Sequence, residues 1–176
     1  MKFVILTYLQ NLSFAETTQS ILKEQWDIDA EIVIGYTIGE KYTKYNVIAH
    51  GMKDYIIDVY DDDIFYLEDD VRFTHNPMSI DFTKDIVWCV YRRGKITNKN
   101  HIITGSQAIY FSKKSINRFK TYMTKNKFKQ IDSYISDFIY RNPDLTFQQP
   151  KKIGYECEHN SLISKKEHWM KYTKPN

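Results

Sequence analysis

Three consecutive carboxylates, Glu68, Asp69 and Asp70, directly follow the short apolar run 64–67. Packed together and partly removed from water, such groups repel one another and raise each other's pKa. A divalent cation removes that conflict, and hard carboxylate oxygens suit Mg²⁺ or Mn²⁺. The pattern favours a metal site that stabilises the negative charge of a diphosphate. The other interpretation is an acidic turn that faces solvent.

The elements that must position these carboxylates are indicated by apolar periodicity, which alternates along the chain between strand and helix. Strands are predicted at 1–8, 31–36, 64–67, 85–91 and 108–111. Helices are predicted at 14–26, after a capping box at Ser13 and Glu16, at 48–59, after Ser112, and from near Asp132 to Asn142. The remainder of the chain after Pro143 is predicted to be rich in loops, with two short strands. This alternation predicts an α/β fold with a mainly parallel sheet, in one domain over residues 1–176.

The order of strand and carboxylates decides which edge of the sheet they occupy. Ligands in open α/β sheets bind beyond the carboxyl ends of the strands, where residues 68–70 fall. A second acidic run, 61–63, also contains a D-x-D pattern but precedes the same strand. We therefore expect residues 61–63 to end a helix at the opposite edge. Residues 92–95 are predicted to form a basic turn.

The net charge of +3 hides a strong asymmetry between the two halves of the chain. Residues 1–88 hold seven basic and sixteen acidic side chains, whereas residues 89–176 hold eighteen basic and six acidic ones. A basic half can attract a polyanion such as a nucleotide diphosphate or a nucleic acid. The alternative is that the two halves fold against each other and leave a solvated lysine surface.

Two cysteines and the apolar runs bear on location. No apolar run approaches the roughly 18 residues that span a bilayer, and the start of the chain lacks a signal-peptide pattern. Cys89 lies in an apolar run and Cys157 in a polar one, without a C-x-x-C motif, which is typical of a reducing compartment. We therefore expect a cytoplasmic protein, in a bacterium or a virus-infected cell.

Several segments together resemble glycosyltransferase family 25, the lipopolysaccharide-type transferases with a GT-A fold. Phe65–Val71 resembles the family's L-E-D-D-V motif, and Thr104–Lys114 its G-x-x-A-Y-x-x-S-R/K block. Ile131–Asp132 resembles the family's aspartate at a helix start, and Gln149–Pro150 with Asn160–Ile163 its final segment. The resemblance implies a single-domain GT-A (Rossmann-like) fold with a nucleotide-sugar half (1–88) and an acceptor half (89–176).

The resemblance also implies a donor, a cofactor and the residues that bind them. The donor would be a nucleotide-diphosphate sugar, with a UDP-sugar the first choice, and the metal would be Mn²⁺ or Mg²⁺. Asp70 with Glu68 would hold the metal, and Asp69 would contact the ribose or a metal-bound water. Thr7 and Tyr8 would border the nucleotide base. The donor sugar would be bordered by Gly105, Ser106 and Gln107.

Three further residues have two interpretations each. Asp132 is the candidate general base for the acceptor hydroxyl, because that role needs a carboxylate within hydrogen-bond reach; it is equally a preferred helix N-cap. His159 would complete the metal shell or lie in a surface loop. Lys151 would clamp the diphosphate together with Lys152, or be solvated.

The function that the resemblance implies is sugar transfer from a nucleotide-diphosphate sugar to an acceptor hydroxyl, with inversion at the anomeric carbon. A glycan or lipid-linked saccharide is the first acceptor considered. A hydroxymethylated pyrimidine in viral DNA is the second, because a flipped base would present its hydroxyl in a pocket. A third possibility is a binding module for nucleotide-sugars or glycans without turnover. The oligomeric state is left open.

Overall fold

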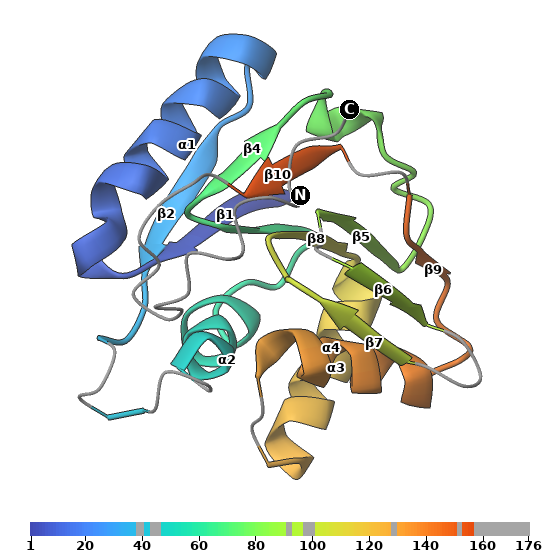
Figure 1. Cartoon of the computed structure of the whole chain (residues 1–176). Coiled ribbons are helices and arrows are strands. Elements are labelled where there is room, and N and C mark those ends of the chain that lie inside the picture. Colours follow the sequence, from blue (N-terminus) through green and yellow to red (C-terminus); the bar gives the residue numbers. More distant parts are fainter. Residues whose placement is uncertain are drawn as a thin grey trace.

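The computed structural model describes residues 1–37, 41–42, 47–90, 93–96, 101–127, 130–150 and 153–156. Its centre is a six-stranded sheet with the strand order β2-β1-β3-β8-β5-β9 (Figure 1). The strands are β1 (Lys2–Thr7), β2 (Ala30–Ile34), β3 (Ile64–Glu68), β5 (Ile86–Val90), β8 (Ala108–Phe111) and β9 (Phe147–Gln148).

The sheet is mixed but mainly parallel. β1 pairs in parallel with both β2 and β3, and β5 pairs in parallel with β9. β8 lies between β3 and β5 and is antiparallel to both, so it alone runs against the other five strands. The predicted fold class, a mainly parallel sheet flanked by helices, is confirmed.

Helices cover both faces of this sheet (Figure 1). α1 (Leu12–Trp26) packs through Ala15 and Leu22 on the face that carries Phe65 and Leu67. The opposite face is covered by α2 (Val47–Met52), the π-helical turn η2 (Lys53–Ile57), α3 (Lys113–Lys125) and α4 (Ile131–Arg141). None of the helices in the described ranges has the length and apolar character needed to cross a membrane.

The helix boundaries follow local sequence signals in the second half better than in the first. Ser112 caps α3, because its hydroxyl accepts the backbone N–H of Ser115 at 3.2 Å. α4 ends at Arg141, directly before Asn142, as predicted. The capping box predicted at Ser13 is wrong. A 3₁₀ turn, η1 (Leu9–Asn11), leads straight into α1 and places Ser13 inside the helix.

Two short strand pairs lie outside the main sheet. β4 (Val71–Phe73) pairs antiparallel with β10 (Gly154–Glu156), and β6 (Arg93–Ile96) pairs antiparallel with β7 (His101–Thr104). The basic turn predicted at 92–95 is therefore wrong, because Arg93–Ile96 is a strand. Gly154 allows the close approach of β10 to β4: a Cβ there would lie 2.4 Å from the carbonyl oxygen of Arg72.

Part of the charge asymmetry is compensated by ion pairs within the fold. Along α3, Lys113 pairs with Asp61 (2.9 Å) and Lys114 with Asp85 (3.1 Å). Lys120 also pairs across the two halves, with Asp58 (3.6 Å). The basic second half thus neutralises part of the acidic first half, which is the alternative raised from the sequence.

Candidate functional site

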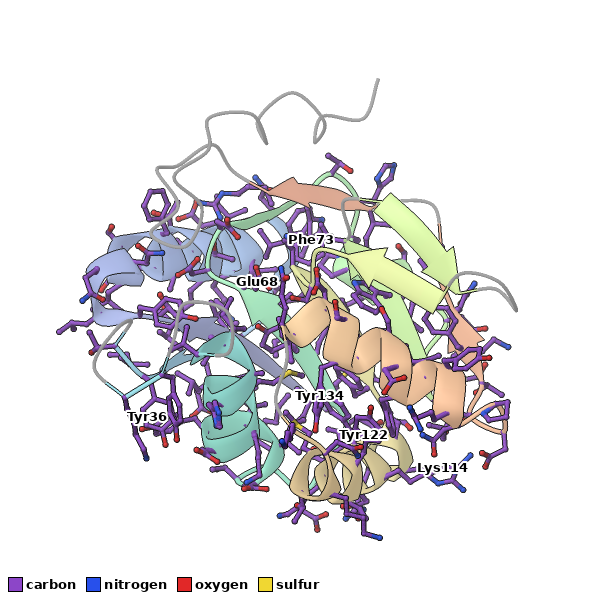
Figure 2. The ribbon with its side chains drawn as sticks, turned by 60° about the horizontal axis from the view of Figure 1, so that its bottom comes forward. Tyr36, Glu68, Phe73, Lys114, Tyr122 and Tyr134 are labelled. Carbon is purple, nitrogen blue, oxygen red and sulfur yellow. The ribbon has the colours of Figure 1, made fainter. Side chains whose placement is uncertain are left out.

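The carboxyl edge of β3 gathers most of the residues singled out in the sequence. β1 and β3 run in parallel with Leu6 opposite Glu68, so Thr7 and Tyr8 end β1 beside residues 68–70. β8 is antiparallel to β3, and its amino end therefore reaches the same edge, where the N–H of Glu68 donates to the carbonyl of Gln107 at 2.9 Å. Figure 2 shows Glu68 near the amino end of α4.

Asp69 faces α1 and is held at both its side chain and its backbone. The Thr7 hydroxyl donates to Asp69 Oδ2 at 2.7 Å, and the Thr18 hydroxyl donates to the Asp69 carbonyl at 2.5 Å. Arg72 Nη1 in turn donates to the Thr18 hydroxyl and to the carbonyl of Val71. With 7% of its surface exposed, Asp69 has a fixed position.

Glu68 points to the opposite face of the sheet, because side chains alternate along a strand. The Ser106 hydroxyl donates to Glu68 Oε1 at 2.5 Å. Ser106 itself is 2% exposed, whereas Glu68 is only partly buried. Within the acidic run, Glu68 is thus the residue that is oriented by the loop before β8 (residues 105–107) and that still reaches solvent.

The loop before β8 (residues 105–107) is also hydrogen-bonded to α4. The N–H of Gly105 donates to Asp132 Oδ2 at 3.2 Å, and the N–H of Ser133 donates to Oδ1 at 2.7 Å. Gly105 has φ +84°, a left-handed conformation that glycine adopts without strain, and its carbonyl accepts from Trp88 Nε1 at 2.9 Å. Asp132 and Glu68 therefore flank the consecutive residues 105 and 106.

Asp70 lies in the turn after β3 and is 4% exposed. Among the described residues, no three or more His, Cys, Asp or Glu side chains form a ready metal cage. The donor chemistry still fits Mg²⁺ or Mn²⁺, because such ions are commonly held by one or two carboxylates and completed by substrate phosphates and water. Two of the predicted ligands, Glu68 and Asp70, meet that description.

Burial and the negative charge at this edge of the sheet raise the pKa of two tyrosines. Burial, followed by the charges of Glu68 and Asp69, raises the pKa of Tyr8 far above its ordinary range. Burial and the same two carboxylates, with Asp70, raise the pKa of Tyr66 likewise. Burial and negative charge thus both favour the neutral phenol at these two positions.

The structure adds residues that sequence reasoning did not select. Thr18 on α1 donates to the Asp69 carbonyl, and Arg72 on β4 donates to the Thr18 hydroxyl. Ser136 on α4 accepts the N–H of Ile103 at 3.0 Å. A signal for Thr18 existed, since a threonine on the apolar face of a helix needs a hydrogen-bond partner when buried. The predicted residues Lys151 and His159 lie outside the described residues.

Comparison with known proteins rests on the fold. No protein-family model and no curated protein matches the chain. The catalytic domain of Drosophila β1,4-galactosyltransferase 7, solved in complex with xylobiose, matches with a TM-score of 0.58 at 9% identity, over 100% of this chain and 81% of that one. A glycosyltransferase involved in glycosylation of the major capsid of PBCV-1 matches with a TM-score of 0.55 at 12% identity, over 86% of this chain and 82% of that one.

The chain has the fold of these glycosyltransferases. At 9% and 12% identity the likeness concerns the arrangement of the backbone, and family 25 itself is not identified by it. The site residues are therefore interpreted from their own geometry and chemistry.

Proposed function

We propose that this protein is a glycosyltransferase that moves a sugar from a nucleotide-diphosphate sugar to an acceptor hydroxyl. One observation carries the proposal. Carboxylates from β3 and α4 converge on the carboxyl edge of the central sheet, in a chain that has the fold of known glycosyltransferases. Open α/β sheets bind their ligands at this edge. The donor we propose is a UDP-sugar.

A divalent cation fits Asp70 and Glu68, with His159 as a third ligand. β10 supports the last assignment, because Glu156 pairs with Val71, next to Asp70. His159 follows Glu156 by three residues, and three extended residues reach about 10 Å. When bound, Mn²⁺ or Mg²⁺ would supply positive charge against the departing diphosphate.

Asp132 is the proposed general base. Its two carboxylate oxygens each accept one backbone N–H, which fixes its orientation and leaves lone pairs for a further proton donor. In the proposed reaction, Asp132 takes the proton of the acceptor hydroxyl as that oxygen attacks the anomeric carbon. The bond from the anomeric carbon to the diphosphate oxygen breaks, the nucleoside diphosphate leaves, and the configuration inverts.

The remaining predicted residues border the donor in this proposal. Thr7 donates to Asp69, which in this proposal contacts the ribose or a metal-bound water, and Ser106 orients Glu68 beside the sugar. Gly105 and Gln107 enclose the same space from the loop before β8, and Lys151 would contact the diphosphate.

For the acceptor we propose a glycan or lipid-linked saccharide. Lys113, Lys114 and Lys120 on α3 each pair with a carboxylate of the first half, so three of the basic side chains that could attract a polynucleotide already have an acidic partner. Retention on a DNA column that falls steeply with salt would instead favour a hydroxymethylated pyrimidine in DNA as the acceptor.

The test of the proposal is release of nucleoside diphosphate. The purified protein is incubated with UDP-glucose, UDP-galactose, UDP-xylose or GDP-mannose, with Mn²⁺ or with EDTA. We expect release from at least one donor with Mn²⁺ and a loss of that release with EDTA. Donor binding without any release, even with saccharide acceptors present, would contradict the proposal and indicate a binding module.

A further inference from the structure

Three buried polar atoms beside Glu68 have no hydrogen-bond partner within the part of the chain that the structure describes. They are the phenol oxygens of Tyr8 and Tyr66 and the Oε1 atom of Gln107. These three residues are 6%, 0% and 2% exposed, respectively. Buried polar atoms are nearly always hydrogen-bonded in folded proteins, so three unsatisfied ones at one place need an explanation.

The three side chains lie on the same face of the sheet: Tyr66 is on β3, and Tyr8 and Gln107 lie directly beyond the ends of the neighbouring strands β1 and β8. Val4 is opposite Tyr66 and Leu6 opposite Glu68, and Tyr8 continues β1 with extended backbone angles. Because side chains alternate, Tyr8 shares the face of Leu6 and Glu68. Gln107 lies opposite Glu68 through the 2.9 Å backbone hydrogen bond and shares the face of Ile109. Glu68 is therefore flanked by all three.

The chemistry of this group selects a neutral ligand. The phenol O–H groups of Tyr8 and Tyr66 offer hydrogen-bond donors, and Gln107 Oε1 offers an acceptor. A phosphate or carboxylate that contacted these three atoms directly, without the proposed cation between it and Glu68 and Asp70, would meet their negative charge at short range, which is unfavourable in a partly desolvated site. An uncharged hydroxyl group both accepts and donates, so it can satisfy the group without that repulsion.

We propose that Tyr8, Tyr66 and Gln107 form a specificity site for one hydroxyl group of the donor sugar, an inference that rests on the proposed glycosyltransferase function. The hydroxyl accepts from the phenols and donates to Gln107 Oε1. A site built to hydrogen-bond a substrate hydroxyl discriminates strongly against an analogue that lacks it or places it differently. These residues thus determine which sugar is transferred.

A comparison of two buried tyrosines tests whether the Tyr66 hydroxyl is unsatisfied, and it needs no measurement of enzyme activity. Tyr134 is 1% exposed, and its hydroxyl lies within 3.2 to 3.4 Å of the backbone carbonyls of Tyr122, Met123 and Asn126. Without donor, Tyr66→Phe should keep or raise Tm, because it removes an unsatisfied hydroxyl, whereas Tyr134→Phe should lower Tm. A fall in Tm for Tyr66→Phe as large as that for Tyr134→Phe would overturn the premise.

The closing experiment measures donor discrimination. For the wild type, kcat/KM of nucleoside diphosphate release is determined with UDP-glucose, UDP-galactose and UDP-xylose, which differ in the placement or presence of a hydroxyl-bearing group. Tyr66→Phe and Tyr8→Phe should each reduce the ratio between the best and second-best donor about five- to tenfold, the effect of one hydrogen bond. The Tyr134→Phe control should leave this ratio unchanged.

Two failures are distinguishable. Wild-type turnover with unchanged ratios in both Tyr66→Phe and Tyr8→Phe would overturn the specificity site and leave the glycosyltransferase function standing. Absence of nucleoside diphosphate release by the wild type from every donor, with Mn²⁺ and acceptors present, would remove the proposed function and this inference with it.

Discussion

Three carboxylates directly precede strand β3 and three others lie at its carboxyl end, and the two sets have different surroundings. Before the strand, Asp61 pairs with Lys113 Nζ at 2.9 Å and Asp63 accepts the Lys113 N–H at 2.7 Å. After the strand, the carboxylates of Glu68 and Asp69 accept from hydroxyl groups. A D-x-D pattern alone therefore does not indicate a function. Its position relative to the strand determines which side chains its carboxylates contact.

Asp85 belongs with the first set, because it precedes β5 at the same edge of the sheet as Asp61 and Asp63. Its Oδ2 accepts from Thr146 N (2.8 Å), Thr146 Oγ1 (3.0 Å) and Lys114 Nζ (3.1 Å). We call Asp61, Asp63 and Asp85 the amino-edge carboxylates, and Glu68, Asp69 and Asp70 the carboxyl-edge carboxylates. Figure 2 shows Glu68 and Lys114 far apart on the molecule. The first set stabilises the fold, and the second is proposed to bind the donor.

The largest effect on activity is expected for Asp70→Ala. Losing a metal ligand at the proposed diphosphate site should lower kcat/KM of nucleoside diphosphate release by about a thousandfold. Asp63→Ala is the matched control at the amino edge and should leave that rate unchanged. Equal losses in both variants, measured with Mn²⁺ on folded protein, would contradict the distinction between the two sets.

The next effect is expected for Asp132→Asn. The amide keeps an oxygen for the Gly105 N–H but is a far weaker base, so transfer should fall about a hundredfold or more. UDP binding, measured by titration calorimetry with Mn²⁺, should stay within twofold of the wild type. Normal transfer by Asp132→Asn would show that Asp132 acts as a helix-capping residue.

Asp85→Asn should reduce stability and leave turnover of the folded protein unchanged. The amide accepts fewer hydrogen bonds and loses its charge interaction with Lys114, for which we expect about 1–3 kcal/mol of lost unfolding free energy. Denaturant melts of Asp85→Asn and Asp70→Ala measure the comparison. A larger loss of stability in Asp70→Ala would reverse the roles assigned to the two edges.

The same residue gives a pH dependence. Burial raises the pKa of Asp85, but hydrogen bonds from Thr146 and Lys114 outweigh it and lower the pKa below its ordinary value. The stability from Asp85 is then fully present above the unfolded-state pKa, near 4, and is lost as pH falls through the lower folded-state pKa. Below pH 4, wild type and Asp85→Asn should converge in Tm. A constant difference down to pH 2 would contradict this account.

The smallest effect is expected for Lys113→Ala. Its ion pair with Asp61 is exposed, and such pairs contribute little in water. The backbone N–H of residue 113 still donates to Asp63. No measurable change in Tm or in turnover is expected, and a marked loss of either would show that the amino edge depends on this side chain.

Much of the fold was predictable because its signals are local. The strand Ala108–Phe111 and the cap at Ser112 follow from apolar residues and a capping side chain within a few positions. Two short strands were expected after Pro143, where β9 and β10 lie. The strands β4, β6 and β7, and the pairings β4–β10 and β6–β7, were not predicted, since strands of three or four residues gain their order from partners elsewhere in the chain. The requirement for glycine at position 154 has no local signal in the sequence, because it arises from the close approach of the Arg72 carbonyl, which leaves no room for a Cβ.

The candidate site divides in the same way. Thr7, Ser106 and Gly105 were selected from the sequence, and the structure joins them to Asp69, Glu68 and Asp132, respectively. Tyr66 was seen only as part of a buried strand, because a phenol without a hydrogen-bond partner can be recognised only when its surroundings are known. The metal, the donor and the roles of His159 and Lys151 stay predictions.

The central claim is that the carboxyl-edge carboxylates bind a nucleotide diphosphate through a divalent cation. A crystal structure of the protein with Mn²⁺ and UDP tests this most directly. The account predicts anomalous density for manganese beside Asp70 and Glu68, with both phosphates of UDP on the ion. Manganese at Asp61–Asp63, or UDP bound away from the end of β3, would contradict it.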